Sequence, residues 1–239
     1  MHNGLDLGAT VLGAARSRHA FEDCVERLAT AIRLGVYPHG STLPPERELS
    51  VRMGVSRATL REAIAALRTA NLVRTTRGRS GGTVVDHPPV TPGEDGDITT
   101  SRAVLMDSLV YRRIVEPGAC YLAASRSLDE DERTMLTDAH AEVVEAASPA
   151  EHRLADSRLH LAIASLTGSD QLVDAVTNVQ AHLHEMLIAI PSLPVNIAHS
   201  SRQHAEIVTA ILEGNAKRAR ATMENHCDDT AALLRGLLR

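Results

Sequence analysis

The chain has 239 residues, 44% of them hydrophobic but with no Trp and one Phe, which indicates a globular protein with an aliphatic core of packed helices. No apolar run reaches the roughly 20 residues of a membrane helix, no signal-peptide pattern is present, and three separated cysteines form no CxxC pair, so we expect a cytoplasmic protein without disulfides. The net charge of −5 is uneven: residues 1–87 hold 12 arginines and 8 acidic residues (+4), residues 88–239 sum to −9, and only the first part is suited to a polyanion.

The first part, residues 18–87, has the element order of a winged helix-turn-helix: three helices followed by a β-hairpin. Ser56 is a good N-cap for the third helix, and Asn71 can end it. The predicted elements are helices over Ala20–Leu34, Glu46–Met53 and Ser56–Ala70, and strands over Val73–Thr76 and Thr83–Val85.

Residues 88–98 are rich in proline, glycine and acids and predict a linker. Residues 99–239 then predict an antiparallel bundle of six or seven helices, so the chain as a whole is mainly α. Pro149, Gly168, Pro191, Pro194 and Gly214 mark the expected breaks. The predicted helices cover Arg102–Arg126, Asp129–Ala147, Ala150–Leu166, Gln171–Ile190, Asn196–Glu213 and Ala216–Leu238.

Cationic and hydroxyl side chains alternate with apolar ones between Glu46 and Arg61, so that one face can pack and the other can meet DNA. The first turns of a recognition helix enter the major groove, where Arg pairs with guanine and Thr contacts thymine or phosphate. The alternative is that these arginines form a solvated helix face, but the like charges of Arg57 and Arg61 at i,i+4 would mildly destabilise such a helix. The candidate DNA-binding residues of the two helices are Arg47, Arg57, Thr59 and Arg61, joined by Arg77 and Arg79 on the hairpin tip.

The stretch IRLGVYPHGSTLPPERELSVRMGVSRATLREAIAALRTANLVRTTRGRSGGTVV resembles the DNA-binding domain of the GntR family of bacterial regulators. The departures are His39, Ser50 and Asn71, none of which is a contact position. The resemblance places the DNA contacts on Glu46, Arg47, Ser56, Arg57, Thr59, Arg61, Arg77 and Gly78.

Candidate metal ligands lie in the acidic part. Asp156 and His160 are four residues apart and share a helix face, while His204 and His226 lie on two later helices. One carboxylate and three imidazoles suit a divalent cation such as Zn²⁺, with positions left open for water or an oxyanion. With 12 histidines in the chain, each one could equally be an ordinary core residue.

Residues 102–235 resemble the FCD ligand-binding domain of the FadR-like branch of the same family, through YRRIVEPGACYLAA, ADSRLH, SRQHAEIVTAI and RATMENHC. The resemblance implies that Asp156, His160, His204 and His226 hold a metal, most simply Zn²⁺ with Ni²⁺ or Mn²⁺ as alternatives, and that a small carboxylate completes its coordination. Arg112 would then bind the effector carboxylate, or instead form an ion pair with Glu116 at i,i+4. Asn178 and Gln180 are treated as ordinary polar positions.

These features predict a homodimeric repressor that binds a short palindromic operator on double-stranded DNA and is controlled by an organic acid. Two alternatives remain. The metal itself could be the effector, or the bundle could be a helical metalloenzyme, with Glu185 or Glu206 as general base. Neither glutamate lies in a recognisable catalytic motif, and an enzyme has no use for the Arg/Thr helix.

Overall fold

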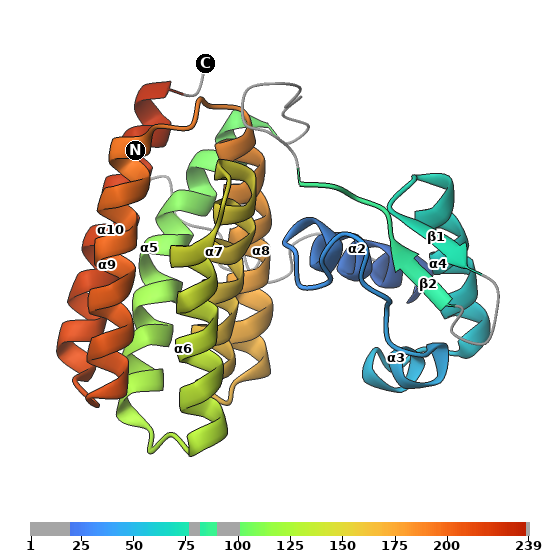
Figure 1. Ribbon diagram of the computed structural model, residues 1–239, viewed down its shortest axis with the longest axis horizontal. Helices are drawn as coiled ribbons and strands as arrows, with labels where there is room; N and C mark the ends of the chain where they lie inside the picture. The colour runs from blue at the N-terminus through green and yellow to red at the C-terminus, as the bar shows by residue number, and fades with distance from the viewer. Residues whose placement is uncertain (1–19, 77–81, 90–100, 238–239) are drawn as a thin grey trace, which may run out of the picture.

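The computed structural model describes residues 20–76, 82–89 and 101–237 (Figure 1). A small N-terminal part and a six-helix C-terminal part lie side by side, and the chain is mainly helical, as predicted. The predicted linker, residues 88–98, falls almost wholly outside the described ranges. Within those ranges, no helix is both long and apolar enough to cross a membrane.

The N-terminal part, called the head below, is a winged helix-turn-helix. Strands β1 and β2 pair antiparallel with Val73 opposite Val85, and a single bridge from Thr42 to Val84 ties the preceding loop to this wing. One aliphatic cluster, including Leu28, Leu60 and Leu67, joins the helices to the hairpin. The elements are α2 (Ala20–Arg33), α3 (Glu46–Arg52), α4 (Arg57–Thr69), β1 (Val73–Thr76) and β2 (Gly82–Val85).

The ends of α4 are formed as predicted. Ser56 is its N-cap, with Oγ accepting a hydrogen bond from the Thr59 amide at 3.0 Å. Asn71 takes the left-handed conformation (φ 58°) just after the helix, a conformation that Asn tolerates better than most residues. Gly54, at φ 65°, makes the turn between α3 and α4.

The C-terminal part is a bundle whose first helix, α5, packs against α7, α8, α9 and α10. Six helices lie within 101–237, within the predicted six or seven. Pro149 and Pro194 mark breaks between helices, as predicted, and each is the first residue of the helix that follows, because the first helical position needs no amide proton. The helices are α5 (Arg102–Ser125), α6 (Glu130–Glu145), α7 (Pro149–Ser165), α8 (Asp170–Ile188), α9 (Pro194–Leu212) and α10 (Ala216–Leu237).

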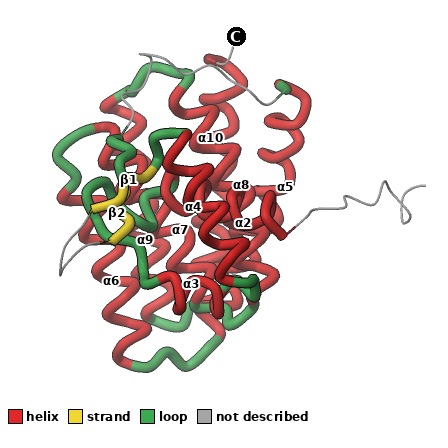
Figure 2. The backbone as a smooth tube through the Cα atoms, turned by 90° about the vertical axis from the view of Figure 1, so that its right-hand side faces the viewer, coloured by secondary structure: helices red, strands yellow, loops and turns green. Residues whose placement is uncertain are grey.

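The head contacts the bundle through the end of α2 (Figure 2, viewed from the side of the head). Nη1 of Arg158 on α7 donates to the carbonyl of Gly35 at 3.3 Å. Gly35 has φ +71°, and a Cβ at this position would lie 3.1 Å from Cβ of Leu154, so only glycine fits this close approach. Arg27 also lies 3.6 Å from Asp174 on α8.

Candidate metal, effector and DNA sites

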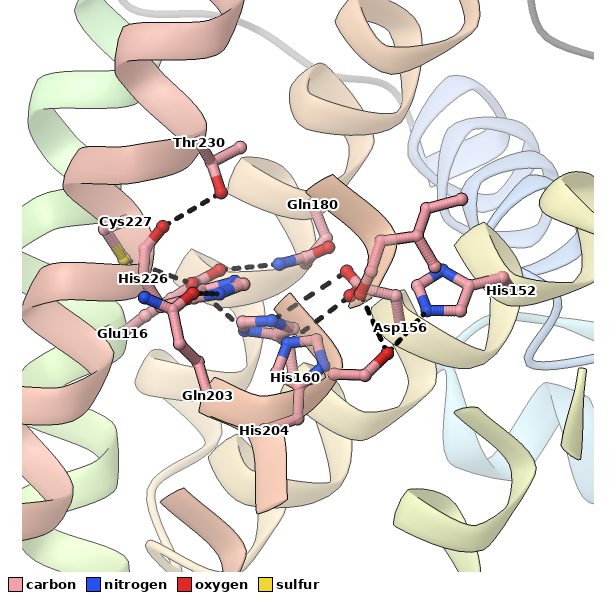
Figure 3. Close-up of polar contacts among 12 residues, drawn as sticks. Glu116, His152, Asp156, His160, Gln180, Gln203, His204, His226, Cys227 and Thr230 are labelled. Atoms are coloured by element: carbon pink, nitrogen blue, oxygen red, sulfur yellow. Dashed lines mark hydrogen bonds and ion pairs between the residues drawn. The ribbon is translucent and has the colours of Figure 1, made fainter. Parts of the chain in front are cut away.

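Three histidines from three helices meet in the middle of the bundle (Figure 3). His160 comes from α7, His204 from α9 and His226 from α10, and all three are buried. Their ring centroids are 4.6–5.4 Å apart, and one ring nitrogen of each lies within 4.8 Å of the others. The helices therefore direct three imidazoles towards one point.

Asp156 lies on the same side of the cluster, one helical turn before His160. Its Oδ1 is 3.4 Å from Nε2 of His204, and its Oδ2 is 3.9 Å from Nε2 of His160. Donor atoms around a tetrahedral Zn²⁺ are about 3.3 Å apart, given Zn–N distances near 2.0–2.1 Å. The structure thus brings together all four residues that the sequence singled out.

The chemistry of this donor set fits a metal cation. Burial lowers the pKa of His204 to about 4, although Asp156 opposes this shift, and burial also lowers the pKa of His226 well below its usual value. Both are therefore neutral imidazoles, the form that binds metals. Among the described residues, neither Nε2 of His160 nor either ring nitrogen of His204 has a hydrogen bond of acceptable geometry. Buried nitrogens without partners are costly unless something coordinates them.

Glu116 organises the polar groups behind the cluster. Its Oε2 accepts from Nε of Arg112 at 2.9 Å and lies 3.0 Å from Nδ1 of His160, while Oε1 accepts from Nε2 of Gln180 at 2.6 Å. Burial acts to raise the pKa of Glu116, but Arg112 and His160 outweigh it, so the pKa lies well below its usual value. The carboxylate is therefore ionised and can fix the ring of His160.

Arg112 forms the ion pair that the sequence left open, and its other nitrogens leave the effector-binding role as a prediction. Its Nε makes the predicted ion pair with Glu116, and the side chain is only 1% exposed. Its Nη1 and Nη2 have no hydrogen-bond partner among the described residues, and Arg112 lines a cavity of about 120 Å³ that also reaches Asp156 and His226. An arginine fork directed into such a cavity is suited to an anion.

Two glutamines were not identified from the sequence. Gln180 is completely buried against Glu116, and Oε1 of Gln203 lies 3.1 Å from Nδ1 of His226. Gln203 also lines the cavity. Gln203 contacts the predicted ligand His226 and Gln180 contacts Glu116, but no motif distinguishes either glutamine.

The predicted DNA-binding residues lie on α3, on α4 and on the turn between them. Arg47 and Arg57 are exposed, and Arg57 is the first residue of α4. Arg61 is exposed as well, with Nε 2.7 Å from Oε2 of Glu46, so this arginine is already paired in the protein alone. Ser56 and Thr59 share a hydroxyl hydrogen bond of 2.8 Å.

The predicted wing residues Arg77, Gly78 and Arg79 lie outside the described residues. The two strands that lead to them, β1 and β2, are paired in register up to Thr76 and Gly82. The hairpin itself is therefore in place, while the contacts of its tip stay a prediction.

A winged helix-turn-helix joined to a separate helical bundle defines a class of two-part DNA-binding regulators. The chain belongs to the bacterial regulatory proteins of the gntR family: the model of that family's DNA-binding domain matches residues 21–85, and the FCD domain model matches residues 107–229. The resemblance found in the sequence is confirmed. The protein is a DNA-binding transcription regulator.

Curated relatives agree with this assignment. RmpR of Mycobacterium gastri, assigned as an HTH-type transcriptional regulator, is 32% identical over 84% of this chain and 75% of its own length. A protein of Escherichia coli K12, assigned as the regulator of the L-lactate dehydrogenase operon, is 27% identical over 87% of this chain and 84% of its own. These relatives and both matched domains are regulators, not enzymes, so the metalloenzyme alternative is set aside.

A solved structure shares the fold. The E. coli protein McbR/YncC aligns with a TM-score of 0.55 over 92% of this chain and 98% of its own, at 16% sequence identity. At this identity the likeness supports the architecture alone.

Proposed function

We propose that this protein is a repressor whose operator binding is controlled by a small organic acid, bound at a divalent metal in the bundle. The observation that carries the proposal is a buried cluster of three histidines with Asp156 beside it, next to a cavity that Asp156, His226 and Arg112 line. The named function of the E. coli relative, control of an L-lactate dehydrogenase operon, concerns a carboxylate and supports the same class of effector.

The metal would be held by Asp156, His160, His204 and His226. Zn²⁺ suits one carboxylate and three imidazoles, and Ni²⁺ and Mn²⁺ are the alternatives. When bound, the metal supplies a Lewis-acidic anchor for a carboxylate oxygen. Arg112 would neutralise the same carboxylate, and Glu116 holds Arg112 and His160 in place.

Helix α7 offers a route from this site to the head. Asp156 and His160 lie on α7 within a few residues of Arg158, which donates to Gly35 of the head. Arg158 is also held by Glu142 on α6, at 2.7 Å. A small shift of α7 on effector binding would therefore be passed to the head and change its position relative to DNA.

Dimerisation is supported by an exposed apolar stripe on α5. Because a helix advances 100° per residue, the six apolar side chains of this stripe fall within one third of the circumference of α5. Asp107, Ser125 and Gly118 lie on the same face, and a Cβ at Gly118 would meet nothing within 4 Å, which leaves room for a second helix. The exposed members of this stripe are Val104, Val110, Tyr111, Ile114, Tyr121 and Leu122.

On DNA, a twofold dimer would place two α4 helices in successive turns of the major groove, over a short palindromic operator. Arg47, Arg57, Thr59 and Arg61 are the proposed contacts of α3 and α4, with Ser56 holding the start of α4. Arg77, Gly78 and Arg79 would reach the backbone or the minor groove.

The alternative in which the metal is itself the effector is separated by one titration. Operator binding of the full chain is measured at several concentrations of Zn²⁺, with and without organic acids, by fluorescence anisotropy. We expect release only when metal and acid are both present. Release by Zn²⁺ alone would favour the metal-responsive regulator, and insensitivity to every combination would contradict the proposed control.

A further inference from the structure

The cavity beside the histidine cluster extends along the helices. The lining residues of α7, of α8 with the segment that follows it, of α9 and of α10 each cover seven residue steps. They run from Asp156 back to Pro149, from Leu183 to Ile190, from Gln203 back to Asn196, and from His226 to Leu233. Seven residues of helix correspond to about 10.5 Å. The cavity is therefore a shaft that runs from the histidine cluster to one end of the bundle.

The two ends of this shaft differ in chemistry. The inner end holds Arg112, Asp156, Gln203 and His226, all able to bind a charged or polar group. The outer part, on the side of α8, α9 and α10, is lined mainly by aliphatic side chains, with Ser192, Asn196 and Ser200 between them. Four of the six aliphatic side chains are not fully buried by the protein alone. These six are Leu183, Leu187, Ile190, Leu193, Ile197 and Leu233.

Polar groups along the shaft are already engaged with one another. Oδ2 of Asp229 lies 2.9 Å from Nε2 of His199 and accepts from Nε2 of Gln203 at 2.8 Å. These bonds hold the pKa of Asp229 below its usual value, so the carboxylate is ionised and repels a second anionic group near it. On the α7 side, Nε2 of His152 lies 3.5 Å from Oγ of Ser201. This ring nitrogen of His152 is therefore already engaged within the protein.

From this polarity gradient we infer that the effector is an amphipathic monocarboxylate, whose carboxylate lies at the inner end and whose apolar tail fills the outer shaft. This inference rests on the proposed function. A cavity of about 150 Å³ accommodates a benzene ring, so the 120 Å³ here suits a chain of roughly three to five carbons beyond the carboxylate. The mostly aliphatic wall of α8, α9 and α10 favours an apolar tail over a hydroxylated one, because a hydroxyl that faces aliphatic side chains loses water without gaining a partner.

The test is calorimetric titration of the full chain loaded with Zn²⁺. One series is acetate, propanoate, butanoate and pentanoate; the comparison series is lactate, succinate and glutarate. Affinity should rise about four-fold with each added methylene, the transfer free energy of one buried CH₂, and level off when the shaft is full. Pentanoate should bind more tightly than glutarate.

Variants locate the tail. Leu187 and Leu233 line the outer shaft and are partly buried. Leu187→Ser and Leu233→Ser should each reduce the affinity for pentanoate several-fold and leave the affinity for acetate unchanged. Val144→Ser, at a side chain 64% exposed on α6, is the matched control and should change neither. Melting curves of all three variants verify that they fold.

The outcomes separate the two levels of the proposal. Tighter binding of glutarate or lactate than of pentanoate, or equal losses for acetate and pentanoate in the leucine variants, would overturn the apolar-tail inference and leave an acid-controlled regulator standing. If no acid of either series binds the Zn²⁺-loaded protein, the proposed function itself fails.

Discussion

Oε2 of Glu116 lies 3.0 Å from Nδ1 of His160 and also accepts the Nε hydrogen of Arg112 at 2.9 Å. One oxygen atom therefore connects a proposed metal ligand with the proposed effector-binding arginine. A carboxylate behind a histidine fixes the tautomer and the orientation of the ring and increases its basicity. Through Glu116, a displacement of Arg112 by an effector would change the position of His160 at the proposed metal site.

Glu116→Gln should weaken metal binding about 10- to 100-fold, the usual cost of losing such a partner. The substitution keeps the size of the side chain, so the bundle should still fold. Metal affinity is measured by competition with a chromophoric chelator. Glu213→Gln, an exposed position paired with Arg218, is the control and should leave affinity unchanged. Equal affinities in both variants would contradict the role of Glu116.

The sequence predicted the four proposed metal ligands but not the residues that hold them. Asp156 and His160 are linked by helical spacing, and His204 and His226 by the resemblance. Gln180 was treated as an ordinary polar position, because its burial against Glu116 depends on how α8 is rotated against α5. That rotation is set by packing across the whole bundle, which local patterns do not contain.

At the helix ends, too, some features follow from local sequence and others do not. The cap at Ser56 follows from local chemistry and was predicted. Pro149 and Pro194 mark breaks as expected, but α7 and α9 begin at these prolines, one and two residues earlier than predicted. Proline can precede a helix or begin it, and only the course of the following chain distinguishes the two positions.

Arg57→Ala should reduce operator affinity by about 1–3 kcal/mol and relax base preference at one position of each half-site. Arg57 is exposed at the start of α4, where a recognition helix meets base edges. Binding is measured by anisotropy at fixed salt against operator variants. Arg218→Ala, on the exposed start of α10, removes the same charge far from the head and should have no effect. Unaltered specificity in Arg57→Ala would rule out this assignment.

Ile114→Asp should dissociate the proposed dimer. Ile114 is 70% exposed within the apolar stripe of α5, and a carboxylate there would be buried against the second copy at high cost. Light scattering after size exclusion should give about 25.7 kDa, the mass of one chain. Val195→Asp, at a residue 80% exposed on α9, is the control. A dimer that survives Ile114→Asp must use another surface.

The metal-free protein should lose stability in mild acid, in part through His184. Burial lowers the pKa of His184 to about 4, and Arg153 adds to this shift. Because the folded pKa lies below the unfolded value near 6.5, the unfolded state binds more protons between pH 6.5 and 4. The free energy of unfolding therefore falls as pH falls through this window.

Urea unfolding at several pH values measures this dependence. In His184→Leu, the slope of the unfolding free energy against pH should decrease by up to about 1.4 kcal/mol per pH unit, which corresponds to the uptake of one proton. His182→Leu replaces a half-buried histidine two residues earlier on the same helix and serves as the comparison. If the slopes of the wild-type chain and His184→Leu are the same, His184 is not a source of the acid sensitivity.

Arg158→Ala should uncouple effector binding from DNA binding while leaving each largely intact. Arg158 lies on α7 beside the proposed ligands and donates to the carbonyl of Gly35 in the head, so its removal breaks a direct connection between them. Acid affinity is measured by calorimetry, and operator affinity by anisotropy with and without acid. The ratio of the two operator affinities should approach one.

Arg158 also pairs with Glu142, so the control must remove that ion pair alone. Glu142→Gln does so and keeps the bond to Gly35. Since an exposed pair of this kind contributes little to stability, we expect Glu142→Gln to respond to acid as the wild-type protein does. If Arg158→Ala keeps the full acid response, the signal passes by another route, such as the contact of Arg27 with Asp174 on α8. If both variants lose the response, the ion pair between α6 and α7, and not the bond to Gly35, transmits the change.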